Sequence, residues 1–178
     1  MADPIILTAL LDADTQRIAT DLRRRFFPPE RNYLDAHLTL AHHLPGAQCD
    51  ALLAHVRTVV ATRQPFPIYV RELIDLGKGT ALRISTAPDR KEIRPLVELR
   101  TALLAPFAAQ LTPQDRRPWR RPHLTIQNKV DKATARALRR RLGRLFEPRA
   151  GRVIGVGVYA YRGGPWARLA ELPFGLIG

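Results

Sequence analysis

Cysteine is almost absent from this chain of 178 residues, since Cys49 is the only one. A single cysteine excludes an internal disulfide and a metal site built from several thiolates. Long apolar runs are missing too. The apolar stretch over residues 5–11 is broken by Thr8 and is far shorter than the roughly 20 residues of a transmembrane helix. Met1-Ala2-Asp3 lacks the basic start of a secretory signal. We therefore expect a cytoplasmic protein with no membrane partner.

Acidic residues are scarce, with 16 Asp and Glu against 29 Lys and Arg and a net charge of +13. Residues 1–89 hold 10 basic and 10 acidic side chains, whereas residues 90–178 hold 19 and 6, so the whole surplus lies in the second half. This asymmetry indicates an anionic partner or substrate. Only four of the basic residues are lysines, however, and an Arg-, Ala- and Pro-rich chain can also reflect the base composition of its gene.

The remaining composition is that of a globular domain, with 46% hydrophobic and 25% charged residues. Periodicity and turn signals predict a strand over residues 4–11, a helix capped by Asp14 and ended by Pro28-Pro29, a strand over 34–43, a helix over 47–62, a hairpin over 66–76 and 80–87, and a helix opened by Asp89 and Glu92 as a capping box. They then predict a basic loop over 112–121, a strand over 122–130, a helix over 131–146 with Leu138, Leu142 and Leu145 inward, and a hairpin over 152–162 and 166–174.

The predicted elements repeat in the same order. His37 precedes Gly77 by 40 residues, His123 precedes Gly163 by 40 residues, and the two histidines are 86 residues apart. We expect one α+β domain over residues 1–178, formed by duplication, with lobes near 1–87 and 88–178 and strands that can be exchanged between them. Each lobe would have a mainly antiparallel sheet flanked by helices, with a cleft between the lobes.

Two short motifs occupy equivalent places in this repeat: His37-Leu38-Thr39-Leu40 (the first motif) and His123-Leu124-Thr125-Ile126 (the second motif). Side chains alternate along a strand, so each histidine and threonine would face the cleft while the aliphatic residues anchor the strand in the core. One such motif alone is more typical of an exposed strand histidine. Two copies in register indicate a paired site.

The chemistry of such a pair is concrete. Imidazole has an ordinary pKa of about 6.5, so neutral and protonated rings coexist near pH 7. Across a phosphodiester, a neutral histidine can take a proton from the nucleophile while a protonated one gives a proton to the leaving oxygen. Threonine hydroxyls can donate to the non-bridging oxygens. Neither a metal nor a cofactor is required.

The paired motifs, the duplication and the chain length resemble the 2H phosphoesterase superfamily. Within it, the stretches Arg121–Ile126 and Tyr161–Trp166 are most similar to the bacterial 2′-5′ RNA ligase-like branch. The resemblance implies a bilobal fold with the two histidine strands side by side in a central cleft. It implies metal-independent 2′,3′-cyclic phosphodiesterase or reversible 2′-5′ ligase chemistry on RNA ends or nucleotides.

The resemblance also implies site residues. His37 and His123 would be catalytic and Thr39 and Thr125 would bind the phosphate. For hydrolysis we assign His37 as the base and His123 as the acid. The expected partner is an RNA or nucleotide with a cyclic or 2′-5′ phosphodiester, bound by a chain whose oligomeric state stays open, with a monomer as the default.

Further substrate contacts are predicted less directly. The branch often has a basic residue soon after the second motif, and alternation puts Gln127 and Lys129 on the side of His123. In the predicted strand over residues 34–43, which contains the first motif, alternation puts His43 on the side of His37 and turns His42 away. Other candidates are Arg120, Arg121, Tyr161 and Trp166, whose alternatives are a solvated loop for the arginines and core packing for Trp166.

Two other functions remain open at this stage. The charge asymmetry would also suit a non-catalytic RNA- or nucleotide-binding module. A metal hydrolase using Asp35, His37, His42 and His43 is disfavoured, because alternation separates His42 from the other histidines. For the phosphodiesterase, the reactive phosphate of the substrate would lie between His37 and His123, and the rest of the polyanion would run over the side of the cleft formed by residues 116–121.

Overall fold

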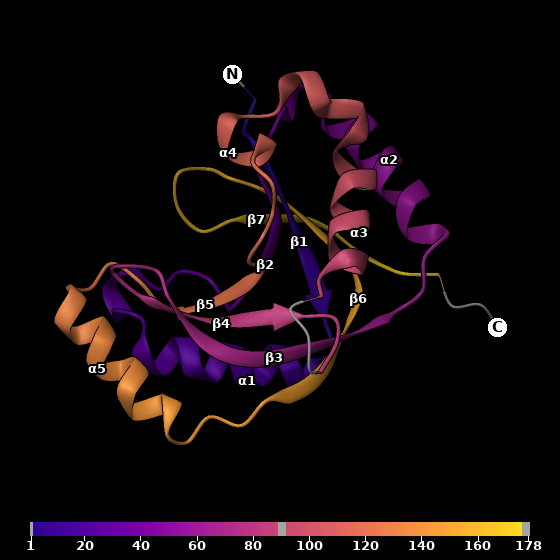
Figure 1. Cartoon of the computed structure of the whole chain (residues 1–178). Coiled ribbons are helices and arrows are strands. Elements are labelled where there is room, and N and C mark those ends of the chain that lie inside the picture. Colours follow the sequence, from indigo (N-terminus) through magenta and orange to yellow (C-terminus); the bar gives the residue numbers. More distant parts are fainter. Residues whose placement is uncertain (1, 89–91, 176–178) are drawn as a thin grey trace.

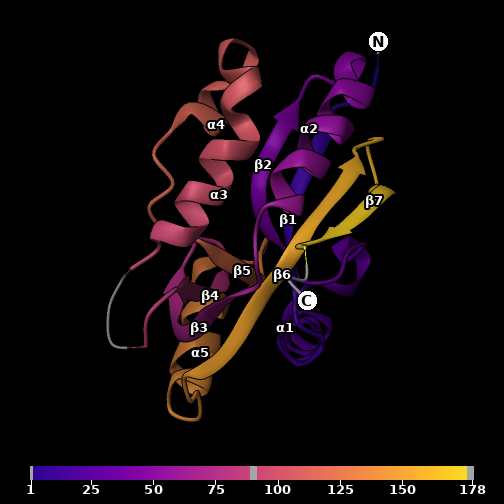
Figure 2. The same cartoon turned by 90° about the vertical axis from the view of Figure 1, so that its right-hand side faces the viewer.

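The computed structural model describes residues 2–88 and 92–175, and its strands form one seven-stranded antiparallel sheet with helices around it (Figures 1 and 2). The predicted α+β class is confirmed. The strands are β1 (Ile5–Leu11), β2 (Leu38–Leu44), β3 (Phe66–Asp75), β4 (Thr80–Ser85), β5 (His123–Gln127), β6 (Arg149–Ala160) and β7 (Ala167–Pro173). The helices are α1 (Ala13–Phe26), α2 (Cys49–Ala61), α3 (Arg94–Leu104), α4 (Pro113–Arg116) and α5 (Lys132–Gly143).

The long strand β6 joins the two sheets that the repeat predicts into one. The order is β2-β1-β6-β3-β4-β5, and β7 pairs with β6 as well. One edge of β6 pairs with β1, whereas the other edge pairs with β3 over residues 149–153 and with β7 over residues 155–160. The first and second motifs therefore lie on the two outermost strands of a single curved sheet.

The spatial lobes exchange elements between the halves of the sequence. Helix α1 belongs to the first half but packs against β5 of the second, and α5 packs against β3 (Figure 1). Helices α2 and α3 cover the other end of the sheet, and α4 contacts β2. Each motif thus receives support from both halves of the chain.

Helix boundaries correct two predictions. Helix α1 is capped by Asp12 rather than Asp14, because Asp12 Oδ1 accepts from the Thr15 N–H at 3.0 Å. Helix α5 ends at Gly143, so Leu145 is 77% exposed instead of inward. Asp89 lies outside the described residues, and helix α3 begins at Arg94 with Glu92 Oε1 accepting the Arg94 N–H.

The aliphatic residues of both motifs lie in the main hydrophobic core, as predicted. Leu38, Leu124 and Ile126 are fully buried and Leu40 is 1% exposed. This burial fixes the two strands by one face and turns their histidine and threonine side chains toward the other. No helix in the described part of the chain is long and apolar enough to cross a membrane.

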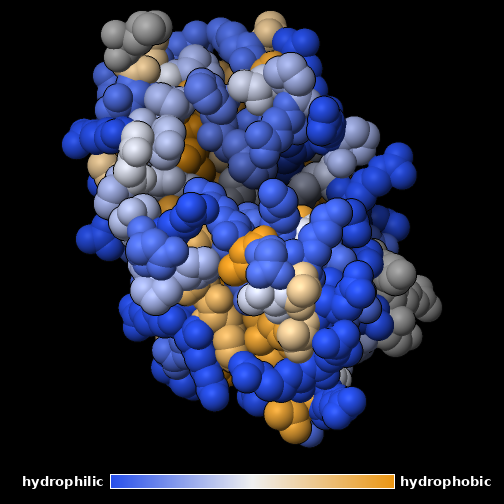
Figure 3. All heavy atoms as spheres, turned by 90° about the vertical axis from the view of Figure 1, so that its left-hand side faces the viewer, coloured by the Kyte–Doolittle hydropathy of each residue, from blue (hydrophilic) through white to orange (hydrophobic). Residues whose placement is uncertain are grey.

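Positive charge gathers around α5 as well as around residues 116–121. The helix contains Lys132, Arg136, Arg139, Arg140 and Arg141 and no acidic residue. It lies at the left of Figure 1, and Figure 3 shows that side as a mostly hydrophilic face with apolar side chains near its middle. The basic residues of the second half are therefore found on helix α5 as well as in the loop over residues 116–121.

Candidate active site

The curvature of the sheet brings its two edge strands together. Strands β2 and β5 stand at opposite ends of the strand order, yet they contact each other. β2 starts at Leu38 and β5 starts at His123, so His37 and His123 both lie where a strand begins. The predicted meeting of the two motifs is thus built by closing one sheet on itself.

Both histidine rings are held by the same device. His37 Nδ1 lies 2.8 Å from the carbonyl oxygen of Asp35, and His123 Nδ1 lies 2.8 Å from that of Arg121. A carbonyl oxygen can only accept, so Nδ1–H donates in each ring and Nε2 is the atom that exchanges a proton. The spacing of two residues between carbonyl and ring is the same in both motifs.

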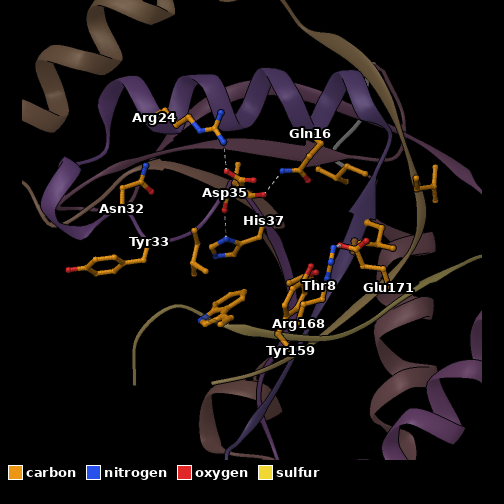
Figure 4. A pocket seen from close by; sticks show the side chains of 17 residues that line it. Thr8, Gln16, Arg24, Asn32, Tyr33, Asp35, His37, Tyr159, Arg168 and Glu171 are labelled. Atoms are coloured by element: carbon orange, nitrogen blue, oxygen red, sulfur yellow. Dashed lines mark hydrogen bonds and ion pairs between the residues drawn. The ribbon is translucent and has the colours of Figure 1, made fainter. Parts of the chain in front are cut away.

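His37 sits in a partly dry, aromatic environment (Figure 4). Its ring centroid lies 4.5 Å from that of Trp166, whose ring in turn lies 5.8 Å from Tyr159. Burial lowers the pKa of His37 from 6.5 to about 4; the Asp35 carbonyl opposes this shift, while the positive charges of Arg23, His42 and His123 add to it. His37 is therefore neutral at pH 7, which is the state that a general base needs.

A cavity of about 780 Å³ opens beside His37. Its walls come from β1, α1, the segment before β2, and β6 and β7, and its polar and aromatic lining comprises Thr8, Gln16, Arg24, Asn32, Tyr33, Asp35, Tyr159, Trp166, Arg168 and Glu171. Thr8 pairs directly with Thr39 across β1 and β2, so the threonine of the first motif faces the same side. The volume suits a small organic ligand.

The second motif does not line this cavity. His123 pairs with Arg83 and Thr125 with Ala81 across β4 and β5, and none of these four residues belongs to the cavity wall. His123 nevertheless lies close enough to His37 for its charge to lower the pKa of that ring. The cavity thus occupies the His37 side of the histidine pair.

Strand β2 is irregular, and this corrects the predicted sides of His42 and His43. Thr39 pairs with Thr8 and Ala41 pairs with Leu7, so β2 has one residue more than β1 at this point. Such a bulge shifts the alternation by one residue, and Ala41 lies in the core. His42, rather than His43, then shares the side of the first motif.

His42 is engaged by a buried carboxylate. Asp115 of α4 is 1% exposed and accepts from the His42 ring Nδ1 at 3.0 Å and from the backbone N–H of His42 and of His43, each at 3.0 Å. Burial raises the pKa of Asp115, but the His42 hydrogen bonds outweigh it, so the net pKa is lowered. Arg100 of α3 also donates to the Leu40 carbonyl at 2.8 Å. The outer edge of β2 is therefore anchored.

The structure separates the predicted substrate contacts. Trp166 contacts His37, as above. Gln127 is 4% exposed, and Thr80 Oγ1 donates to it at 3.4 Å. Its predicted place in the cleft is therefore wrong. Lys129 lies in a turn beyond β5 with a left-handed φ of 60°, where strand alternation does not apply. Tyr161 is 43% exposed and is not part of the cavity wall.

The remaining candidates lie at the surface. His43, Arg120 and Arg121 are exposed. The carbonyl of Arg121, rather than its guanidinium, is the group that reaches His123. Trp119 packs on the core, with the Arg100 guanidinium 5.9 Å from its ring centroid. The arginine-rich loop thus supports the second motif through its backbone.

Tyr159 is a cavity residue that the sequence analysis missed. A glycine two residues before it carries the signal, because a Cβ at Gly157 would lie 2.7 Å from Tyr159 Cε2 and 2.8 Å from Thr8 Oγ1. A glycine inside a strand marks such a close approach. The ring of Tyr159 therefore needs the space that Gly157 leaves.

The residues of the metal hypothesis are not gathered around one point. No group of three or more His, Cys, Asp or Glu side chains suited to a metal ion occurs within residues 2–88 and 92–175. Asp35 is paired with Arg24 at 3.0 Å, and His42 with Asp115 at 3.0 Å.

Comparison with known proteins identifies the family. The sequence profile of the 2′-5′ RNA ligase superfamily matches residues 11–165. No curated protein matches the sequence significantly. Among solved structures, one described as a phosphoesterase has a TM-score of 0.66 at 20% identity and covers 99% of this chain and 100% of its own.

Two further structures are similar. LigT of E. coli, complexed with 3′-AMP, has a TM-score of 0.65 at 18% identity over 98% of this chain and 99% of its own. The protein TT0787 of Thermus thermophilus has a TM-score of 0.65 at 16% identity over 96% and 97%. The profile covers most of the chain, and these folds match it along nearly its whole length. This chain therefore belongs to the 2′-5′ RNA ligase superfamily and has the LigT-like fold of the 2H phosphoesterases.

Proposed function

We propose that this protein is a metal-independent phosphodiesterase that hydrolyses 2′,3′-cyclic phosphates of nucleotides or RNA ends. The observation that carries the proposal is the matched pair of histidines. Each ring has its Nδ1–H fixed by a carbonyl at 2.8 Å, which leaves both Nε2 atoms to exchange protons. Acid–base catalysis on one phosphate needs two such rings, one that takes a proton and one that gives a proton.

In the proposed hydrolysis, neutral His37 takes a proton from water at Nε2 while the water oxygen attacks phosphorus. The bond from phosphorus to one ribose oxygen breaks, and protonated His123 gives the Nε2 proton to that oxygen. One proton enters His37 and one leaves His123, so exchange of protons with solvent restores both rings. When an RNA 5′-hydroxyl replaces water as the nucleophile, the same two roles would form a 2′-5′ linkage. Cleavage of that linkage back to the cyclic phosphate would exchange them.

The threonines and the cavity complete the proposal. Thr39 and Thr125 would donate to the non-bridging oxygens, where charge increases during attack. The cavity beside His37 would hold the nucleoside, with Trp166 and Tyr159 along it. Structures of E. coli LigT complexed with 3′-AMP, ATP and NADP⁺ support a nucleotide as the ligand class.

The test is turnover of 2′,3′-cyclic nucleotides and 2′-5′-linked oligonucleotides by the wild type, His37→Ala, His123→Ala and the double variant, with and without EDTA. We expect each single variant to lose at least about 100-fold in kcat, and EDTA to have no effect. Arg57→Ala, on the outer helix α2, is the control that keeps full activity.

One outcome would favour the alternative of a binding module. If the wild type binds nucleotides or RNA with a steep salt dependence but turns none of them over, and the histidine variants bind equally well, the catalytic proposal is overturned. Activity that disappears with EDTA and returns with one added metal would overturn the metal-independent mechanism.

A further inference from the structure

A single buried arginine connects the two motifs. Arg23 of α1 is 5% exposed. Its Nε lies 2.9 Å from the carbonyl oxygen of Leu34, in the segment that leads to His37, and 2.9 Å from Oδ1 of Asn32. Its Nη1 lies 2.9 Å from the carbonyl oxygen of Thr125, in the second motif. One rigid guanidinium thus hydrogen-bonds to the backbone three residues before His37 and two residues after His123.

The arginine supplies hydrogen-bond donors to backbone groups at the two edges of the sheet. β5 is an outermost strand and the chain from Leu34 runs into β2, the other outermost strand, so their outward backbone groups need partners from elsewhere. Arg23 supplies donors to both sides at once. Phe27 covers the guanidinium, whose carbon lies 4.0 Å from the ring centroid.

Burial of the charged Arg23 guanidinium costs free energy, because the charge loses its hydration. Packing alone therefore explains its position poorly. Burial lowers the pKa of Arg23 to about 10, with the charge of Asp35 opposing the shift, so Arg23 stays charged at neutral pH. The Asp35 carboxylate itself is paired with Arg24 at 3.0 Å. A buried charge is tolerated when its donors are satisfied, and here the acceptors are the amide oxygen of Asn32 and the carbonyl oxygens of Leu34 and Thr125.

We propose that Arg23 is the positioning residue of the histidine pair: it fixes the distance between the segment before His37 and the strand of His123, without contact with the substrate. The proposal rests on the proposed function for its activity readout. The planar guanidinium is essential to it, because a lysine has one donor atom and cannot span the two carbonyl groups in the same way.

The charge of Arg23 has a second consequence, since it favours the neutral form of His37. Other groups also face this ring: His42 from β2, His123 from β5 and Trp166 from the segment before β7. The charged and titratable groups of the adjoining cavity are Arg24, Asp35, Tyr159, Arg168 and Glu171. Among the cations whose charges lower the pKa of His37, Arg23 is the one that is buried and always charged near pH 7.

The experiment compares Arg23→Met and Arg23→Lys with Arg25→Met, an exposed neighbour on the same helix. For Arg23→Met we expect kcat to fall at least tenfold, KM to change less than threefold, and the NMR titration of the His37 ring to move toward the ordinary value. For Arg23→Lys we expect the His37 titration to stay low, because the charge remains, while kcat still falls. Arg25→Met should change none of these quantities.

The amide chemical shifts and the His37 titration distinguish a loss of positioning from a failure to fold and from a lack of activity. If Arg23→Met does not fold, the lysine variant decides, through kcat and the amide chemical shifts of residues 123–126. If the wild type turns over no substrate, those shifts and the His37 titration still decide. Folded variants with an unchanged kcat, an unchanged His37 titration and unchanged shifts in the second motif would overturn the positioning role.

Discussion

The two motifs share their histidine geometry but not their surroundings. Both rings donate Nδ1–H to the carbonyl two residues earlier, at 2.8 Å. His37 then packs against Trp166 beside the large cavity, whereas His123 lies opposite Arg83 at the start of β5, outside the cavity wall. The repeat preserves the chemical group in both places, and the difference in environment is what can divide base from acid.

The largest expected effect tests that division directly. We expect His37→Ala and His123→Ala each to lower kcat by about 10²- to 10⁴-fold on a natural ribose leaving group. With a nitrophenyl ester, whose leaving oxygen needs no proton, activity should return largely in His123→Ala and stay low in His37→Ala. Single-turnover kinetics with both esters measure this. The reverse pattern would exchange the two roles.

The threonines give a smaller effect and test the symmetry of the site. Thr39→Ala and Thr125→Ala should each lower kcat by about 10- to 100-fold, because each removes one donor to a phosphoryl oxygen. Thr39→Ser and Thr125→Ser keep the hydroxyl and should retain most activity. A loss confined to one threonine, measured as kcat/KM, would show that only one motif binds the phosphate.

Trp166 belongs to the His37 side, and its removal should make the two motifs more alike. Trp166→Ala should raise the dissociation constant of a nucleoside monophosphate about fivefold or more, as expected for loss of a stacking surface worth about 1–3 kcal/mol. Trp166→Phe should restore much of the affinity. Calorimetric titration with a nucleoside monophosphate measures the affinity of both variants. Unchanged affinity in Trp166→Ala would remove this residue from the substrate site.

The smallest expected effect concerns how kcat/KM and stability depend on pH. Since burial lowers the pKa of His37 to about 4, the acidic limb of kcat/KM should fall near pH 4 instead of near 6.5. The unfolded ring still protonates near 6.5, so the unfolded state binds more protons between these values. The stability contribution of neutral His37 is thus complete above about 6.5 and is lost as the pH falls toward 4.

Urea unfolding at pH 7 and at pH 4.5 checks this sign. The wild type should lose more stability between these pH values than His37→Gln, which has no ring to protonate. An equal loss in both proteins, together with an acidic limb near 6.5, would show that His37 titrates as an ordinary exposed histidine.

Local patterns predicted the parts of this site that depend on local sequence. Alternation placed Leu38 and Leu124 in the core, and the glycine-rich turn around Lys78 predicted the hairpin that joins β3 and β4. Repetition of the motifs at matching places predicted that they meet. These features follow from strand periodicity and turn chemistry, which neighbouring residues determine.

The failures depend on pairing between distant segments. The bulge that moves Ala41 into the core arises from the register with β1 and reverses the sides of His42 and His43. Gln127 is buried because Thr80, on the neighbouring strand, offers it a hydroxyl. Arg23 gave a weak signal, since it continues the buried spacing of Thr15 and Ala19 on α1, but an arginine there is expected to be solvated until its acceptors are seen.

Strand β6 connects both ends of the sheet, and this has a consequence for how the chain unfolds. It pairs with β1 on one edge and with β3 and β7 on the other, so neither end of the sheet keeps all its backbone hydrogen bonds if β6 leaves. We therefore do not expect the two halves of the chain to melt one after the other as independent domains do. A single cooperative transition is expected, with tertiary and secondary structure lost together, and the geometry of the histidine pair should persist up to that transition.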